Sequence, residues 1–202
     1  TDPVEDAEIK VTQTTEGNSE HDVTVSALKH REAAIHYLIV INEDIDHTRS
    51  AKATIVDLDV HQGNGTAWAL EGDPDCFTLS LHQENNYPVK QRSSLDLGLP
   101  DHCQDTEYLA ALDQGLDAVS LFDPDFLIYV AGADAYQGDQ RGGLDLTIEG
   151  LEARDHAVFG ASLGRGLPTM ACLAGGYAES EDLVVEIHFR MIRAGLNARN
   201  TG

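Results

Sequence analysis

One short stretch of the chain has the residue types and the spacing of a metal site. Asp57-Leu-Asp59-Val-His61 places two carboxylates and an imidazole at alternate positions. On an extended strand, residues two apart point to the same face, so these side chains converge. Because neighbouring carboxylates repel each other, a cation between them is the natural solution. Asp59 and His61 are ligand types of catalytic zinc sites, which keep one position open for water or substrate.

Reactive residues also follow other apolar runs. Asp134 comes directly after one of them and is a candidate third metal ligand. Tyr177 follows Gly175-Gly176, where the backbone can turn tightly and bring a phenol close to a site. Taken alone, Asp59 could cap a turn, His61 could be a buried structural histidine and Tyr177 a packing residue. The combination of reactive strand ends favours the metal site.

The elements that must position these residues follow an α/β pattern. In open sheets of parallel strands, ligands bind at the carboxyl ends of the strands, where these residues lie. The alternation of strands and helices predicts a mostly parallel sheet covered on both faces. We expect strands at 53–60, 76–81, 126–131 and 169–173, and helices at 27–41, 106–121, 147–163 and 180–196.

The sequence divides into two parts of different character. Residues 1–25 are polar, rich in threonine and glutamate, and show no clear period, so we expect a loosely ordered acidic leader. Residues 26–202 carry the regular pattern and are expected to form one α/β domain.

Charge narrows the classes of partner. The chain has 35 acidic and 13 basic residues, and its formal charge of −22 argues against direct binding of nucleic acid through phosphates. A cationic partner is favoured instead, and the acidic surface suits either high salt or an ordinary cytoplasmic enzyme. The three cysteines form no CxxC pair, which indicates a reducing, cytoplasmic location. We expect no membrane span, because no apolar run is long enough.

Four motifs in one order resemble the zinc-dependent histone deacetylase family. They are Ile55-Val-Asp-Leu-Asp-Val-His-Gln-Gly-Asn-Gly65, Leu79-Ser-Leu-His82 with Asn86-Tyr-Pro88, Gly132-Ala-Asp-Ala-Tyr-Gln-Gly-Asp139 with Gly143-Leu144, and Leu173-Ala-Gly-Gly-Tyr177. The similarity extends over residues 52–195. It implies a three-layer arginase/deacetylase-like α/β sandwich around a mostly parallel sheet, lacking the N-terminal strands of the family.

The resemblance also implies an activity and a ligand set. Zn²⁺ would be held by Asp59, His61 and Asp134, and the Tyr177 hydroxyl would donate to the substrate carbonyl. Zinc-activated water would then remove acetyl groups from acetyl-lysine or acetylpolyamine. A structural K⁺ or Na⁺ is implied at Asp57, Asp59, His61, Ser80 and Leu81.

The sequence departs from the family before the first motif. Members carry a His-His pair that serves as general base and acid, and no such dipeptide occurs here. None of the histidines at 21, 30 and 36 is assigned to that role. Either the chain is a fragment, or its N-terminal half has been replaced. In both cases we expect an uncovered sheet edge that favours a homo-oligomer.

Two other functions remain open. Without the histidine pair, the chain could be a catalytically impaired module that binds zinc or acyl-lysine, because general acid–base catalysis contributes about 10²–10⁴-fold. Asp57-x-Asp59 also resembles the nucleophile pair of haloacid-dehalogenase-type phosphatases. That chemistry needs a later lysine to hold the phosphoryl charge, and no lysine follows Lys90.

Overall fold

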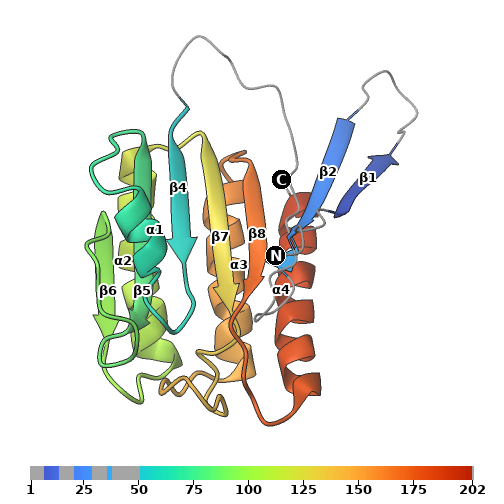
Figure 1. Cartoon of the computed structure of the whole chain (residues 1–202). Coiled ribbons are helices and arrows are strands. Elements are labelled where there is room, and N and C mark those ends of the chain that lie inside the picture. The colour runs from blue at the N-terminus through green and yellow to red at the C-terminus, as the bar shows by residue number, and fades with distance from the viewer. Residues whose placement is uncertain (1–6, 14–20, 29–35, 38–50, 202) are drawn as a thin grey trace, which may run out of the picture.

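A five-stranded parallel sheet forms the centre of the molecule (Figure 1). The computed structural model describes residues 7–13, 21–28, 36–37 and 51–201. The strand order is β6-β5-β4-β7-β8, and the carboxyl ends of the strands share one edge, the lower one in Figure 1. The strands are β4 (Ala53–Asp57), β5 (Cys76–Gln83), β6 (Leu95–Leu99), β7 (Phe126–Gly132) and β8 (Thr169–Ala174).

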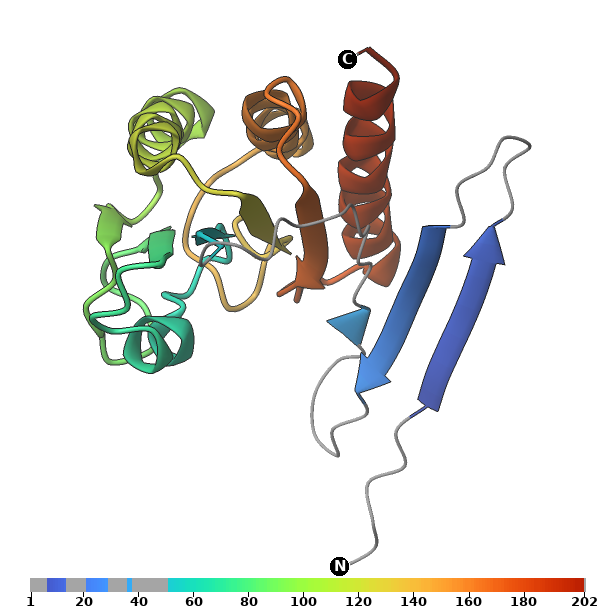
Figure 2. The ribbon, with the colours of Figure 1, turned by 90° about the horizontal axis from the view of Figure 1, so that it is seen from above.

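Helices flank this sheet. The elements are α1 (Asn64–Ala69), α2 (Asp105–Phe122), α3 (Ile148–Leu163) and α4 (Glu181–Thr201). Seen from above, α2 and α3 lie on one face, α4 lies beside α3, and the short α1 lies on the opposite face (Figure 2). The central strands are therefore covered on both faces, and β4 is buried along nearly its whole length.

The hydrophobic core lies between the sheet and the α2–α3 layer. Buried apolar residues recur along α2 with helical spacing, and the tyrosine of β7 stacks edge-on against Phe159 of α3, with 5.7 Å between ring centroids. Core residues include Val56, Leu79, Leu81, Tyr108, Leu112, Leu116, Leu127, Tyr129, Leu151 and Val158. This packing fixes the strands whose ends carry the candidate ligands.

A small antiparallel sheet of three strands is formed by the N-terminal part of the chain. β1 (Ala7–Gln13) pairs with β2 (His21–Leu28), and β2 pairs with β3 (His36–Tyr37). The sequence predicted no regular element in 1–25 and a helix over 27–41. Three consecutive β-branched residues, Val23-Thr-Val25, explain β2, and strand positions at 27–28 and 36–37 contradict the helix there. The remainder of both predicted segments lies outside the described residues.

The four predicted strands and the three later predicted helices are all present, with shifted ends. β6 and α1 were missed. Asp96 and Gly98 are poor strand formers and hid β6, while the Asn-Gly that begins α1 is typical of a turn. All three cysteines are free. None of the helices in the described ranges combines the length and apolar character that crossing a membrane requires.

Candidate metal centre

Asp59, His61 and Asp134 come together at the carboxyl edge of the sheet. One potential ligand atom from each lies within 4.8 Å of the others. The Nδ1 of His61 is 3.0 Å from Asp59 Oδ1 and 3.4 Å from Asp134 Oδ2. Asp134 is fully buried, whereas Asp59 and His61 are partly exposed. The cluster is therefore open to solvent at Asp59 and His61, which follow β4, and closed at Asp134, which follows β7.

Main-chain donors fix the carboxylates in place. The N–H of Val60 donates to Asp134 Oδ1 at 2.9 Å, and the N–H of His61 donates to Asp59 Oδ1 at 2.9 Å. The second oxygen of Asp134, Oδ2, is buried and accepts no hydrogen bond from the described residues. A buried carboxylate oxygen without a donor is costly unless a cation satisfies it. The orphaned oxygen therefore points to a bound cation.

Two glycines leave room for the carboxylates. A Cβ on Gly175 would lie 1.8 Å from Asp134 Oδ2 and 2.6 Å from Asp59 Oδ2. A Cβ on Gly132 would lie 2.5 Å from the Cα of Asp59, so the ends of β4 and β7 approach each other closely there. These contacts give a steric reason for glycine at both positions. A zinc ion fits this set of two carboxylates and one imidazole, in which one carboxylate oxygen lacks a hydrogen-bond donor.

The cluster is electrostatically strained without a cation. Burial, together with repulsion from Asp59, raises the pKa of Asp134 to about 6. The adjacent carboxylates of Asp134 and Asp59 raise the pKa of His61 to about 9. Burial and repulsion from Asp59 raise the pKa of Asp57 to about 8. In the metal-free protein, protons thus offset the negative charge, and a divalent cation would replace them.

The residues implied for a monovalent cation lie directly beside this cluster. Asp57 and Ser80 are partners in the β4–β5 register, and both are buried. The Ser80 hydroxyl lies 3.0 Å from Nδ1 of His82, and the Leu81 side chain packs in the core. A Cβ on Gly63 would lie 2.1 Å from Asp57 Oδ2, so this carboxylate also needs a glycine next to it. Burial lowers the pKa of His82, and the nearby Lys90 lowers it further.

Tyr177 occupies the turn that follows Gly175. Its main-chain N–H donates to Asp139 Oδ2 at 2.6 Å, and the Arg141 guanidinium lies 4.6 Å from its ring centroid. The residue is 44% exposed. Residues 139–141 thus hold Tyr177 in place, and none of them belongs to the cluster of Asp59, His61 and Asp134.

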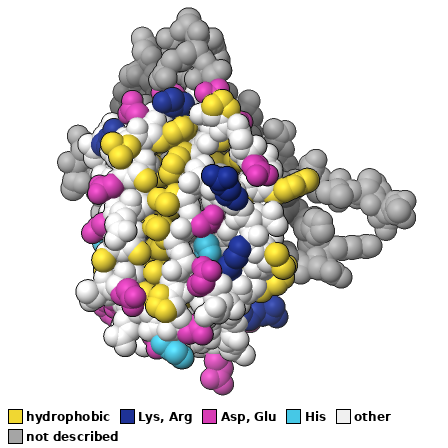
Figure 3. All heavy atoms as spheres, turned by 90° about the vertical axis from the view of Figure 1, so that its left-hand side faces the viewer, with side chains coloured by type: hydrophobic (Ala, Val, Ile, Leu, Met, Phe, Trp, Pro, Cys, Tyr) yellow, Lys and Arg dark blue, Asp and Glu magenta, His cyan; other side chains and the backbone are white. Residues whose placement is uncertain are grey.

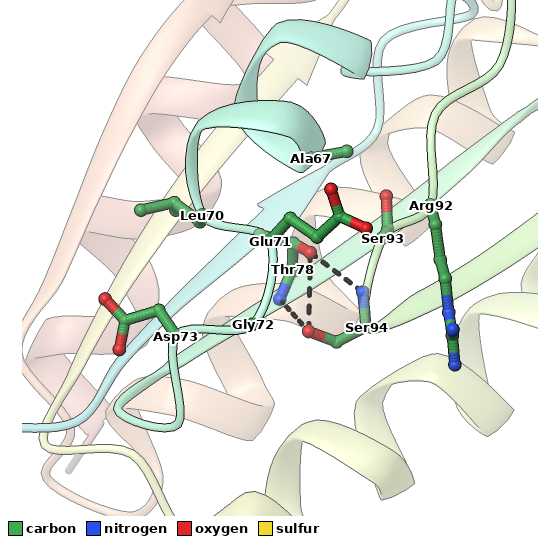
Figure 4. A pocket seen from close by; sticks show the side chains of 9 residues that line it. All are labelled: Ala67, Leu70, Glu71, Gly72, Asp73, Thr78, Arg92, Ser93 and Ser94. Carbon is green, nitrogen blue, oxygen red and sulfur yellow. Dashed lines mark hydrogen bonds between the residues drawn. The ribbon is translucent and has the colours of Figure 1, made fainter.

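A cavity of about 430 Å³ lies away from the metal ligands, between α1, β5 and the segment before β6 (Figure 4). Hydrogen bonds between Thr78 and Ser94 close one of its walls. Its lining is largely polar and contains none of the cluster residues: Ala67, Leu70, Glu71, Gly72, Asp73, Thr78, Arg92, Ser93 and Ser94. The cavity is therefore separate from the candidate metal centre.

Arg154 and Asp155 form a buried charged pair on α3 that none of the sequence motifs indicated. A signal was present in the spacing. Leu151, Arg154 and Val158 share one face of a helix, so an arginine interrupts the stripe that packs on the sheet. A charge on a buried stripe indicates a specific polar partner.

Comparisons with known proteins place the chain in a family. The family model described as "Histone deacetylase domain" matches residues 33–189. The chain belongs to the histone deacetylase family. The match lies within residues 26–202 and includes all three residues of the cluster. It leaves the phosphatase interpretation without support.

Individual relatives agree with this membership. An uncharacterised protein of Picosynechococcus sp. is 45% identical over 142 residues, which cover 69% of this chain and 47% of that protein. Histone deacetylase 2 of Arabidopsis thaliana is 32% identical over 142 residues, covering 68% of this chain and 37% of that protein. The chain thus spans less than half the length of these relatives.

Solved structures share the fold. The HDA15 HD domain superposes with a TM-score of 0.59 at 28% identity, covering 74% of this chain and 49% of that one. Acetylpolyamine aminohydrolase from Burkholderia pseudomallei gives a TM-score of 0.62 at 22% identity, covering 74% of this chain and 45% of that one. The predicted arginase/deacetylase-like α/β fold is confirmed.

Proposed function

We propose that this deacetylase-family chain carries the zinc centre of an amide hydrolase that removes acetyl groups from acetylated amines. The observation that carries the proposal is the buried Oδ2 of Asp134, which has no hydrogen-bond donor among the described residues and lies 3.4 Å from His61 Nδ1 at the carboxyl edge of the sheet. Asp59, His61 and Asp134 would hold the ion. Bound zinc supplies Lewis-acid chemistry, because it polarises a carbonyl and makes water more acidic.

The remaining residues of the site have separate roles in this proposal. The Tyr177 hydroxyl would donate a hydrogen bond to the carbonyl oxygen of the substrate, where negative charge develops during the reaction. Its exposure and its place two residues after Gly175 support that role. A K⁺ or Na⁺ ion beside Asp57 and Ser80 would offset the charge of a buried carboxylate.

The substrate would be an acetylated but otherwise cationic molecule, either a lysine-containing peptide or a polyamine. The formal charge of −22 supports this choice, because negative potential attracts polycations and raises their rate of encounter. Among the solved neighbours, one is named for acetylpolyamine and another is a histone deacetylase, so both substrate types belong in the same assay.

A second candidate function is a module that binds zinc or acyl-lysine with little turnover. The observation that favours it is the sequence itself, in which no two histidines are adjacent. The acid–base pair implied by the family resemblance would then have to come from elsewhere.

Turnover of an acetyl-lysine peptide and of an acetylpolyamine, with and without a zinc chelator, separates the two functions. We expect turnover that the chelator abolishes, and a loss of about 10²–10³-fold for Tyr177→Phe, typical of removing one oxyanion donor. Arg141→Met, which keeps the phenol, is the control for disturbing that turn. Zinc binding without turnover would support the binding module, whereas turnover unaffected by chelator would contradict both.

We further propose that the chain self-associates through β6. In the described part of the chain, β6 pairs with β5 and no strand pairs with its outer side. Figure 3 faces this side of the molecule, and hydrophobic side chains form a band along it. An edge strand with unpaired main-chain groups is a template for a strand of another copy.

A further inference from the structure

Arg154 is the only arginine in the described ranges whose side chain is completely enclosed by protein, with a relative exposure of 1%. It lies on α3 and points toward the sheet. Its Nε and Nη2 donate to Asp155 Oδ1 at 3.0 and 2.8 Å. The remaining donor group, Nη1, is directed away from Asp155 and toward the main chain of the sheet.

Nη1 of Arg154 contacts the ends of two neighbouring strands. It donates to the carbonyl oxygen of Gly132 at 2.6 Å and lies 3.5 Å from the carbonyl oxygen of Leu58. Gly132 ends β7, two residues before Asp134, and Leu58 immediately precedes Asp59. One guanidinium nitrogen therefore joins the two main-chain segments that carry the candidate ligands.

Regular pairing between β4 and β7 ends at this point. The N–H of Leu58 still donates to the Val130 carbonyl at 3.0 Å, but the next inward-facing N–H, that of Val60, donates to the Asp134 side chain instead. Carbonyl groups beyond the ladder need other donors. Arg154 supplies such a donor from α3. It does so next to Gly132, where an added Cβ would clash with the Cα of Asp59.

A buried ion pair by itself adds little to the stability of a protein. Removing two charges from water costs several kcal/mol per ion, and well-packed apolar replacements are often neutral or stabilising. Here the pair is also incompletely hydrogen-bonded, since Asp155 Oδ2 is buried without a hydrogen-bond partner among the described residues. The same holds for the buried Tyr108 hydroxyl. Tyr129 donates to Asp155 Oδ1 at 2.5 Å and fixes the orientation of the carboxylate. The arrangement holds the guanidinium in one place.

We propose that Arg154 is a positioning residue of the metal centre. Its guanidinium holds the carbonyls of Leu58 and Gly132 together and thereby sets the spacing between Asp59 and Asp134. The inference rests on the proposed zinc site and assigns Arg154 no contact with substrate. Residues outside the ligand shell that orient ligands typically change metal affinity by about 10–100-fold when they are replaced.

The test compares zinc affinity, measured by competition with a chromophoric chelator, and the visible spectrum of the Co²⁺-substituted protein. Arg154→Met/Asp155→Leu removes both charges together, so it leaves no unpaired buried ion. We expect its zinc affinity to fall about 10–100-fold and its Co²⁺ bands to change, with thermal unfolding of the metal-free protein little altered. Glu152→Leu/Arg193→Met removes a more exposed ion pair between α3 and α4 and should match the wild type in both metal readouts.

Arg154→Lys provides a second variant in case the double variant does not fold. It keeps the charge, but a single ammonium cannot reproduce the fork that reaches Asp155 and the strand ends at once. We expect a smaller loss of zinc affinity with the same spectral change. Wild-type affinity and spectrum in whichever variants fold would overturn the positioning role. Failure of the wild-type chain itself to bind zinc would instead contradict the proposed metal centre, and the inference with it.

Discussion

Asp134 is the residue on which the proposed metal site depends most. Its two oxygens have different surroundings: Oδ1 accepts from the Val60 N–H, while Oδ2 is buried without a donor. Gly175 keeps the space next to Oδ2 free of side-chain atoms. A single added methyl group is therefore a direct probe of whether that space serves a metal ion.

Gly175→Ala should abolish zinc binding, because its Cβ would lie 1.8 Å from Asp134 Oδ2 and must displace the carboxylate. Gly160→Ala is the matched control, since a Cβ there meets nothing within 4 Å. In the interior of α3, that change should stabilise the protein by about 0.5–1 kcal/mol. Zinc titration and thermal unfolding measure both effects. Wild-type zinc affinity in the Gly175 variant would show that the free space is not part of the site.

His188 on α4 predicts a pH dependence of stability. Burial lowers its pKa below the ordinary value of 6.5; Arg154 lowers it further, while Asp155 and the Ala174 main chain oppose the shift. The unfolded chain then binds more protons than the folded chain below that value. The contribution of His188 to the free energy of unfolding should fall as pH drops below about 6.5, by at most about 1.4 kcal/mol per pH unit. The raised pKa values of Asp57 and Asp134 contribute with the opposite sign.

Urea unfolding of the metal-free protein between pH 5.5 and 7.5 measures this dependence. His188→Gln should remove this contribution and so change the measured slope, while His156→Gln, which replaces an exposed histidine on α3, should leave the slope unchanged. An identical slope in the His188 variant and the wild type would assign the dependence to other groups.

Among the elements, the N-terminus of α3 is hydrogen-bonded to the N-terminus of α2. The Thr147 hydroxyl accepts from the Gly150 N–H at 2.9 Å and donates to Asp105 Oδ2 at 2.6 Å. Thr147→Ala loses the cap and leaves Asp105 without this donor, so we expect a destabilisation of about 1–2 kcal/mol. Thr147→Ser keeps the hydroxyl and should lose much less. Denaturant midpoints compare the two variants, and equal midpoints would show that the Thr147 hydroxyl does not stabilise the protein.

The elements that the sequence could predict are those whose pattern is local. β4, β5, β7 and β8 are apolar runs, and their ends carry Asp59, His61 and Asp134, so both the sheet and the cluster could be predicted from alternation and strand ends. Tyr177 was placed by its motif, and its role stays a prediction.

Other features depend on contacts between distant segments. β6 forms despite Asp96 and Gly98 because it adds to an existing edge of the sheet. Asp96 itself accepts from the Gln62 side chain at 2.7 Å, which no local pattern reveals. The contact of Arg154 with Gly132 likewise joins a helix to a strand end 22 positions away along the chain. Residue propensity describes none of these three features.

At the scale of the whole molecule, the β6 edge and the net charge act against each other. An open edge favours pairing of two copies, whereas a charge of −22 on each copy opposes it at low salt. We therefore expect association to increase with salt in size-exclusion chromatography with light scattering. Leu97→Lys on β6 should reduce it, and Leu121→Lys, an exposed site on α2, should not. A monomer at both high and low salt would exclude self-association.

The central claim is that Asp59, His61 and Asp134 hold one metal ion. Elemental analysis of the purified chain tests it most directly and also distinguishes zinc from iron, which this oxygen-rich ligand set accepts as well. We expect about one zinc ion per chain, and near-complete loss in both His61→Ala and Asp134→Ala, because each removes one of the three candidate ligands in the described part of the chain. A wild-type chain without metal, or unchanged zinc in both variants, would contradict it.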